Sequence, residues 1–366
     1  MIRQFLDHTS RSTARWILRM SRDWPRLAVG AVFMLGVSLI FLWYALREPA
    51  LAPPPPPFII PTATSTLSLA PRALDGVLVH PSSTQLLALA VVVENSLDAR
   101  PLDGPAKADL VIEAPVEGSI TRSLLFFDAS TTVALIGPVR SSRTYFVDWA
   151  EGLQAMFVHV GGSPDSLNRI AASKTFRDLN EYWNGWAFWR SNNRLAPHHV
   201  MTRTDLLLRA AERKKYQPGA FRSWLYRDFS TSTVRTVTHP QIRVPYEGSY
   251  RAEWRYDPDT NMYTRYRAGV PERDADGSVV NAQNVVLLQT QATVVDELGR
   301  LKLRTTGKGR ALLFRDGERK EVTWSRAPGE HLSFTTVDGL DAAFARGKTW
   351  ISVITSAAAF GEAVSG

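Results

Sequence analysis

The sequence contains no cysteine among its 366 residues. This absence excludes disulfide bonds, thiolate metal sites, a cysteine nucleophile and a lipid attached through cysteine. It does not identify the redox compartment, because an exported protein can fold without disulfides. The fold must instead be stabilised by a hydrophobic core, for which a hydrophobic content of 45% is sufficient.

The sequence also lacks a concentrated basic region in its larger part, although the net charge is +8. Residues 1–50 contain seven arginines and three acidic residues, so half of the excess lies in a short N-terminal arm. The remainder contains 36 basic and 32 acidic residues. Such a mixed surface argues against a nucleic-acid partner, because phosphates are bound by basic stripes.

One long apolar run is present at 27–46, with 20 residues and no charge. Its length matches the roughly 20 residues that cross a bilayer as a helix. Six arginines precede the run, whereas Arg47 follows it beside Glu48. The positive-inside rule therefore predicts a cytoplasmic basic arm at 1–26 and a single-pass helix in the lipid bilayer of the cell membrane, with the rest of the chain outside.

A cleaved signal peptide is the alternative, because residues 50–52 have the small-x-small form of a cleavage site. We favour an uncleaved anchor, since the run exceeds the usual apolar core of a signal peptide, about 7–15 residues, and Pro53 follows at once.

Residues 47–84 are predicted to be a linker. Five consecutive prolines indicate an extended spacer, and small polar residues follow, so we expect disorder up to about residue 80.

The rest of the chain predicts an α+β protein, with a mixed α/β domain at 85–235, an all-β domain at 236–357 and a tail at 358–366. In the first domain, apolar runs indicate strands at 86–95, 108–115, 122–128 and 155–160. Helices are expected at 144–153, 166–182 and 204–216. Thr204 is the expected N-cap of the third helix. In the second, aromatic and charged residues alternate on both sides of residues 257–261, which predicts a hairpin.

Several segments occur together in the order of a known family: VVVENSLDARP, ADLVIEAPVEGSITRSLLFF, IGPVRSSRTYFVDWA, FVHVGGSPDSL, and NVVLLQTQATVVDELGRL with GKGRALLFRDG. Through them the sequence resembles the YerB family, the domain of unknown function 3048 (DUF3048), from about residue 86 to 355. The resemblance implies an exported, envelope-associated bacterial protein. Many family members resemble lipoproteins, whereas this chain has no cysteine to acylate and is expected to use a spanning helix. The resemblance supplies no reaction.

Arginine and acidic residues gather in the segments that carry this resemblance. Arg140 and Arg143, three residues apart in GPVRSSR, are suited to binding a carboxylate or a phosphate. Glu117 and Arg122 lie at expected strand ends, where they can either pair with these arginines in a structural network or line a ligand cleft with them. His159 is either a general base or a hydrogen-bonded core residue, and we favour the second role.

The segment FVHVGGSPDSL places Gly161, Gly162, Ser163 and Asp165 between an expected strand and an expected helix. Glycines and free N–H groups at the start of a helix can hold an anion. The segment lacks the lysine and spacing of a Walker loop, and it lacks the G-x-S-x-G pattern of a nucleophile elbow. We therefore favour a structural role, in which Ser163 caps the helix and Pro164 begins it.

Two further groups of residues are candidates for binding sites. Trp183, Trp186 and Trp189 recur every three residues and can stack on sugars or a peptide, but we expect at least two of them to cover the core. His198 and His199 are adjacent, so their side chains point in opposite directions on an extended chain. We predict no metal site and no cofactor.

Together these features favour an anchored extracytoplasmic binding or scaffolding protein of the bacterial envelope. Its partner would be an anionic or glycan-bearing wall component, or another envelope protein. The alternative is a wall-active hydrolase or lyase that uses Glu117 or Asp165 as its acid, assisted by His159. We lean towards a protein without catalytic activity. An open cleft lined by the candidate residues would favour a site, whereas burial and mutual pairing would favour a structural network.

Overall fold

The computed structural model describes residues 28–47, 68–228 and 237–365 of two compact units, residues 1–64 and 65–366. The described part of the first unit contains a helix at Ala28–Ala45 with a mean hydropathy of 2.1. By length and composition this helix could cross a membrane, as predicted for 27–46, although a signal sequence would meet the same criteria. The predicted arm at 1–26 lies outside the described residues, as does most of the predicted linker.

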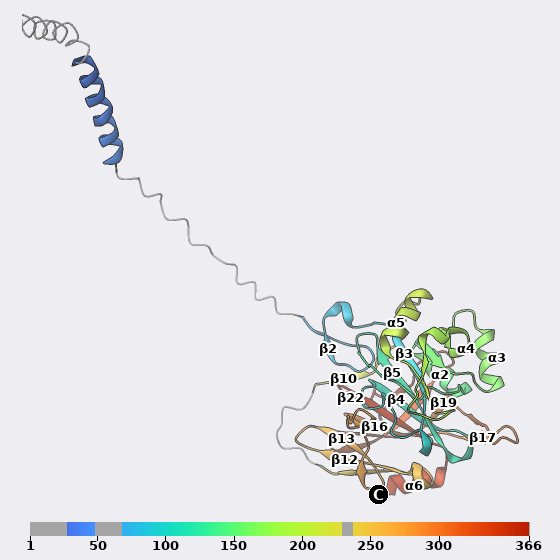
Figure 1. Cartoon of the computed structure of the whole chain (residues 1–366). Helices are drawn as coiled ribbons and strands as arrows, with labels where there is room; N and C mark the ends of the chain where they lie inside the picture. Colours follow the sequence, from blue (N-terminus) through green and yellow to red (C-terminus); the bar gives the residue numbers. More distant parts are fainter. Residues whose placement is uncertain (1–27, 48–67, 229–236, 366) are drawn as a thin grey trace, which may run out of the picture. The chain divides into compact units, whose positions relative to one another are not determined.

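The second unit is built around a mixed sheet of ten strands in the order β21-β20-β19-β16-β23-β4-β5-β3-β6-β7. Figure 1 labels β3, β4, β5, β16 and β19 of this sheet. The pairs β16–β23, β23–β4, β3–β6 and β6–β7 are parallel, and the others are antiparallel. The strands are β3 (Ala88–Glu94), β4 (Leu110–Pro115), β5 (Thr121–Asp128), β6 (Met156–His159), β7 (Asp178–Asn180), β16 (Asn284–Gln289), β19 (Gly307–Arg315), β20 (Glu318–Arg326), β21 (Ser333–Thr335) and β23 (Thr349–Ile354).

Both faces of this sheet are buried. In β3, Leu89, Val91 and Val93 pack on one face against a core that also contains residues of β11, β12, α5 and α6, whereas Ala90 and Val92 pack on the other face with residues of α2. Successive side chains of a strand point to opposite faces, so a strand covered on both sides needs an uninterrupted apolar run. This requirement explains the predicted strand at 86–95, which is confirmed.

The central position of β23 joins the two regions of the chain. β23 lies between β4 and β16, with Thr349 opposite Leu110 on one side and Asn284 on the other. The predicted regions 85–235 and 236–357 therefore contribute to one sheet within one compact unit. The α+β class is confirmed, with a mixed N-terminal region and a β-rich C-terminal region.

A second sheet comes entirely from the C-terminal region and consists of β11 (Gln241–Val244), β12 (Ala252–Asp257), β13 (Met262–Arg267), β14 (Val270–Pro271) and β15 (Asn281–Ala282). β12 and β13 pair as a hairpin with Asp257 opposite Met262, which confirms the predicted turn. Among the described residues of the unit, there are also four two-stranded sheets: β1 (Ala70–Pro71) with β2 (Leu78–Val79), β8 (Trp189–Arg190) with β9 (Val200–Met201), β10 (Leu225–Arg227) with β22 (Ala343–Ala345), and β17 (Ala292–Val294) with β18 (Leu301–Leu303).

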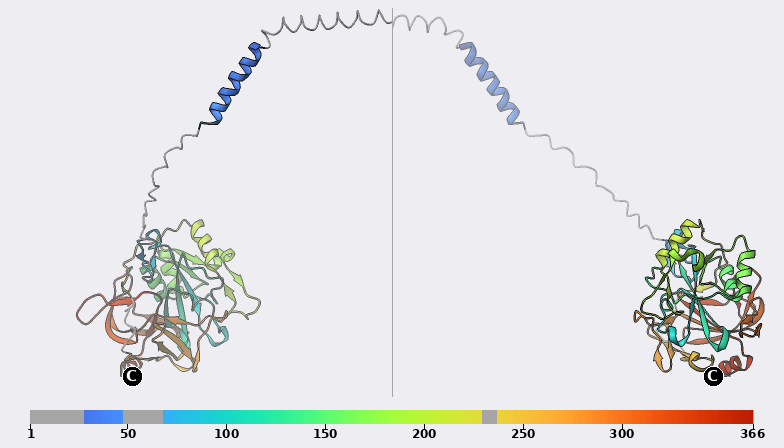
Figure 2. Two further views of the ribbon diagram at one scale, coloured as in Figure 1. Left: turned by 90° about the vertical axis from the view of Figure 1, so that its left-hand side faces the viewer. Right: turned by 45° about the vertical axis from the view of Figure 1, so that its right-hand side comes forward.

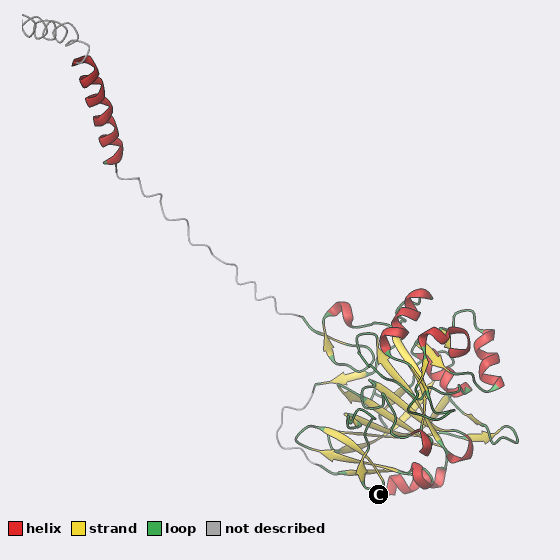
Figure 3. Ribbon diagram, in the orientation of Figure 1, coloured by secondary structure: helices red, strands yellow, loops and turns green. Residues whose placement is uncertain are grey.

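The helices lie around the strands (Figure 3). They are α2 (Thr144–Gly152), α3 (Pro164–Ala172), α4 (Glu181–Asn184), α5 (Thr204–Arg213) and α6 (Ala357–Ser365), and short 3₁₀ segments occur at Pro81–Ser83, Leu97–Ala99, Glu117–Ser119, Gly185–Ala187 and Gly248–Tyr250. α5 and α6 lie at opposite ends of the folded unit in Figures 1 and 2. α6 falls mainly in the predicted tail, which had no recognisable pattern.

Three predictions about local structure are wrong. The helix expected at 166–182 ends at Ala172, and β7 and α4 follow it. Thr204 is the first helical residue instead of the N-cap, and its hydroxyl accepts a hydrogen bond from the Val133 N–H. The end of the predicted linker is folded from residue 70, because Leu74 and Asp75 are buried and Arg72 forms ion pairs with Asp75, Asp109 and Asp128.

Candidate functional site

The two candidate motifs lie side by side. The Gly-Gly-Ser loop follows β6, whereas the segment GPVRSSR lies in the irregular stretch between β5 and α2. Ser142 and Gly162 form a parallel bridge, in which the Ser142 N–H donates to the Gly161 carbonyl (3.0 Å) and the Ser163 N–H donates to the Ser142 carbonyl (3.1 Å). The segment with Arg140 and Arg143 thus runs along the Gly-Gly-Ser loop.

The arginines of this cluster are largely paired. Arg143 donates to the Glu117 carboxylate, with Nε 2.9 Å from Oε1. Arg140 Nε lies 3.4 Å from Glu94 Oε1, and the other Glu94 oxygen lies 2.9 Å from His198 Nδ1. These contacts match the structural network that we weighed for Glu117 and the arginines.

Arg122 differs from the other two arginines. Its side chain is buried, and its Nη1 donates to the Ser141 carbonyl at 2.7 Å. Among the described residues, no carboxylate lies within ion-pair distance of it, and its Nε has no hydrogen-bond partner. Burial, followed by the nearby charges of Arg143 and Arg140, lowers the pKa of Arg122 to about 10. The cluster therefore contains one buried guanidinium that forms no ion pair with a described residue.

His159 lies at the end of β6 and is completely buried. Its Nδ1 lies 2.6 Å from the Gly161 carbonyl oxygen, and its Nε2 lies 2.7 Å from Asp178 Oδ1. Both ring nitrogens are therefore occupied by acceptors of the chain itself. This agrees with the core role that we favoured and leaves neither nitrogen directed at solvent.

The Gly-Gly-Ser loop is shaped by its neighbours. Gly161 has φ +59°, and a Cβ atom there would lie 2.8 Å from the Tyr182 hydroxyl. The Ser163 side chain accepts a hydrogen bond from the Ser166 N–H (3.4 Å), and Pro164 is the first residue of α3. The predicted N-cap is confirmed, and this explains the sequence of the loop without a bound anion.

A cavity of about 580 Å³ opens beside these motifs, and we call it the α2–β18 pocket. Three candidate residues line it, namely Arg143, Ser163 and Asp165. The other residues on that side are Thr144, Asp148 and Arg169, and the opposite side is formed by Gln291, Thr293, Val295, Asp296 and residues 300–306. Glu117, Arg122, Arg140, His159, Gly161 and Gly162 do not line it. Sequence reasoning missed the second wall, which belongs to the C-terminal region.

The α2–β18 pocket is polar and carries mixed charge. Asp148 accepts from the Thr305 hydroxyl (2.5 Å) across the two walls and pairs with Arg169 (2.7 Å). Among the described residues, Lys302 and Asp165 are exposed and have no ion-pair partner. Hydroxyl, amide, cationic and carboxylate groups together suit a hydroxylated ligand that bears charge.

The tryptophan prediction is wrong in its favoured form. Trp183 is 82% exposed and Trp186 is 42% exposed, and Trp189 is partly exposed, so none of the three is buried in the core. The Arg213 guanidinium lies 4.0 Å from the Trp186 ring centroid. These rings belong to the short segment around α4, where they leave a surface available for stacking.

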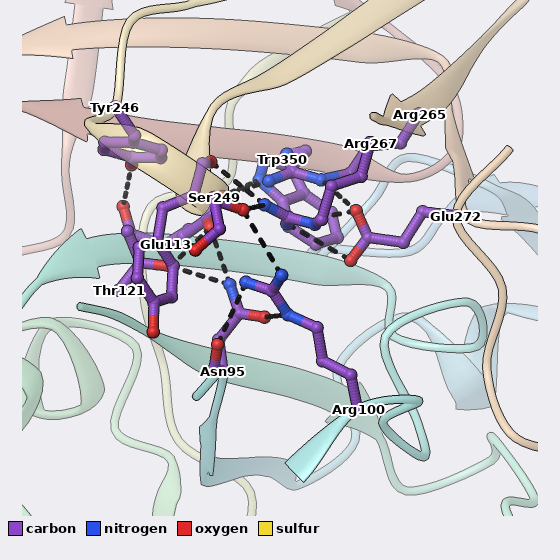
Figure 4. A network of polar contacts seen from close by, with 11 residues as sticks. Asn95, Arg100, Glu113, Thr121, Tyr246, Ser249, Arg265, Arg267, Glu272 and Trp350 are labelled. Carbon is purple, nitrogen blue, oxygen red and sulfur yellow. Dashed lines mark hydrogen bonds and ion pairs between the residues drawn. The ribbon is translucent and has the colours of Figure 1, made fainter. Parts of the chain in front are cut away.

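A second polar cluster, which the sequence did not reveal, lies between the two large sheets (Figure 4). Glu113 on β4 and Arg265 on β13 are both fully buried, with Arg265 Nη2 2.8 Å from Glu113 Oε2. Arg265 also pairs with Glu272 at 2.9 Å, and its guanidinium lies 4.4 Å from the Trp350 ring centroid. A buried ion pair of this kind attaches the C-terminal sheet to the central sheet.

Among the described residues, no group of three or more His, Asp or Glu side chains is arranged to hold a metal ion.

Comparisons with known proteins identify relatives. A family model described as "Protein of unknown function (DUF3048) N-terminal domain" matches residues 74–217, and its C-terminal counterpart matches residues 242–351. A Bacillus subtilis (strain 168) protein named "Putative lipoprotein YerB" is 33% identical over 286 residues, which are 77% of this chain and 85% of that protein. The crystal structure of YerB from Bacillus subtilis superimposes with a TM-score of 0.70 and 32% identity, over 79% of this chain and 98% of the crystallised chain.

Proposed function

Because this chain belongs to the DUF3048 (YerB) family, we propose that it is a membrane-anchored envelope protein that binds a wall component outside the cell without catalysing a reaction. The ligand is a glycan that bears negative charge, and it occupies the α2–β18 pocket. The observation that carries this proposal is the composition of that pocket, in which hydroxyl and amide groups accompany unpaired charged side chains. The Trp183 and Trp186 rings supply a further surface on which sugar rings can stack.

The anchor is supported by the apolar helix Ala28–Ala45 and by the lipoprotein name of the Bacillus subtilis relative. Without cysteine, this chain cannot carry a cysteine-linked lipid, so the helix takes over the attachment. The six arginines before the helix favour a cytoplasmic N-terminus. A C-terminal reporter that is active only in the cytosol should therefore be inactive, and full activity would contradict this orientation.

Binding is favoured over a wall hydrolase or lyase by the state of the candidate acid–base residues. His159 is buried and bonded at both ring nitrogens, and Glu117 is held by Arg143. Asp165 lines the pocket and is exposed. Among the described pocket residues, it has no ion-pair partner that would position its carboxylate for proton transfer. The arrangement supports recognition of a ligand more than general acid catalysis.

The ligand is tested with the full-length chain in detergent and soluble fragments of wall glycan, in neutral and anionic forms. The wild-type chain should bind the anionic fragments, and Lys302→Gln should weaken this binding by about tenfold, the value of one charge-assisted contact. Lys320→Gln, an exposed change of the same charge on β20, should not alter it. Equal binding by wild type and Lys302→Gln would refute the assignment of the pocket. Cleavage of the fragments by wild type but not by Asp165→Asn would favour the enzyme.

A further inference from the structure

A second cavity, of about 490 Å³, lies at the edge of the C-terminal sheet, and we call it the arginine pocket. Four arginines line it, namely Arg100, Arg243, Arg251 and Arg267, with Glu253 as the acidic residue of its lining. No residue of this cavity lines the α2–β18 pocket. The function proposed above therefore does not use it.

Arg100 and Arg267 are partly buried, whereas Arg243 and Arg251 are exposed, and we call the first two the inner end of the arginine pocket. Figure 4 shows both of them beside Ser249. Arg100 Nη1 and Arg267 Nη1 both donate to the carbonyl oxygen of Ser249, at 3.3 Å and 3.2 Å. Two like charges thus meet at one backbone oxygen. Burial, followed by the charge of Arg267, lowers the pKa of Arg100 to about 10.

The carboxylates near this inner end are already engaged. Glu272 pairs with Arg267 (3.1 Å) and with the buried Arg265 (2.9 Å). Arg100 instead donates its Nε to Asn95 Oδ1 at 2.9 Å and lies 5.0 Å from the Tyr250 ring centroid. Within the described parts of the chain, no carboxylate is within ion-pair distance of Arg100. This half-buried guanidinium is therefore not paired directly with a carboxylate.

The outer arginines add to this excess. Arg243 on β11 lies opposite Glu253 on β12, but the Glu253 carboxylate accepts from Arg255 Nε at 2.7 Å. Arg243 and Arg251 are exposed, and neither has an ion-pair partner among the residues that the structure describes. Their guanidinium groups are free to turn towards a ligand.

We propose that the arginine pocket binds a small, multiply charged ligand that carries phosphate groups. Three guanidinium groups without a carboxylate partner surround one cavity, so a ligand with a single negative charge would leave most of the excess in place. The arginines approach from different elements, and therefore in different planes. A tetrahedral phosphate presents oxygens in several directions, whereas a planar carboxylate matches one guanidinium plane at a time.

Isothermal titration calorimetry of the full-length chain in detergent tests this proposal, with inorganic pyrophosphate as the probe and citrate as a carboxylate of comparable charge. Pyrophosphate should bind more tightly than citrate, and its affinity should fall as sodium chloride is raised. The double variant Arg243→Gln/Arg251→Gln should weaken binding by about tenfold or more, since two charge-assisted contacts are lost. Both residues are exposed, so the thermal unfolding of the variant should match that of wild type.

The matched control is Arg209→Gln/Arg222→Gln, which removes two exposed arginines elsewhere in the folded unit. It should bind pyrophosphate as wild type does. The proposal is overturned if wild type gives no binding heat with pyrophosphate, if the control loses as much affinity as the pocket variant, if citrate binds as tightly as pyrophosphate, or if the affinity does not depend on salt. None of these outcomes alters the test of the α2–β18 pocket, which uses another probe and other residues.

Discussion

Replacement of Arg265 by methionine should destabilise the folded unit strongly. The Arg265 guanidinium is fully buried, pairs with Glu113 and Glu272, and lies 4.4 Å from the Trp350 ring centroid and 5.3 Å from that of Trp254. Methionine fills much of the same volume but carries no charge. The change therefore leaves the fully buried Glu113 carboxylate without its counter-charge.

The expected loss can be worked from these contacts. Breaking a buried ion pair by removing one partner costs about 3–5 kcal/mol, because the remaining charge is uncompensated. The lost stacking on two indole rings adds roughly 1 kcal/mol, which the apolar contacts of methionine partly offset. We expect the free energy of unfolding to fall by about 4 kcal/mol, a large part of the roughly 5–15 kcal/mol that stabilises a typical domain.

A double-mutant cycle separates this pair from general damage. Glu113→Gln alone should also destabilise, since the carboxylate accepts from Thr121 Oγ1 (2.8 Å) and Trp350 Nε1 (3.2 Å) in addition to Arg265. An amide group cannot accept at both oxygen positions. The double variant Glu113→Gln/Arg265→Met should cost about 2 kcal/mol less than the sum of the two single variants, because neither charge is then left alone.

Urea unfolding of the full-length chain in detergent, followed by circular dichroism, measures these values. Arg222→Met is the control, because Arg222 is 72% exposed and pairs with Asp341 at the surface, so the change should cost less than about 1 kcal/mol. A loss of under about 1 kcal/mol for Arg265→Met, or strict additivity of the two single changes, would refute the role assigned to this pair.

Three other changes test separate features. Burial raises the pKa of Asp274 from an ordinary value of 3.8 to about 6, so the folded state binds the proton more tightly and the free energy of unfolding should fall as the pH rises from about 4 to 6. In the variant Asp274→Asn, the free energy of unfolding should decrease less over this pH range, by on the order of 3 kcal/mol. The same pH profile in the variant and in wild type would contradict the assignment. Gly152→Ala should cost about 1–3 kcal/mol in urea unfolding, since the new Cβ would lie 2.3 Å from the Glu330 carbonyl oxygen, whereas Gly185→Ala, with nothing within 4 Å, should be nearly neutral. Arg122→Met should leave the melting temperature unchanged or raise it, because this buried guanidinium has no carboxylate partner among the described residues; a clear decrease would show that the charge is stabilising.

The sequence predicted the strands that are buried on both faces better than the way they assemble. The run at 86–95 indicated β3 because a doubly covered strand needs apolar side chains at every position. The pairing of β23 with β4 leaves no such signal, since it depends on contacts between distant parts of the chain. The helix expected at 166–182 was too long, because its apolar spacing continued through β7 although α3 ends at Ala172.

The candidate site was predictable only in part, because it also depends on contacts between distant parts of the chain. The motifs around Arg143 and Ser163 belong to one predicted domain, and the bridge between Ser142 and Gly162 brings them together. The opposite wall of the α2–β18 pocket comes from residues 291–306, which local patterns could not bring to this place. Arg265 lies in an alternating hairpin sequence that is typical of a half-exposed strand. Its burial results from the packing of one sheet on another.

The central place of β23 has a consequence for how the protein is made. Among the described strands of the ten-stranded sheet, β23 comes last along the chain, and yet it fills the gap between β4 and β16. Until it emerges, β4 and β16 each present an open edge of backbone N–H and C=O groups, which can pair with other chains. A stop codon placed before Thr349 should therefore cause the second unit to aggregate instead of giving a shortened but folded protein.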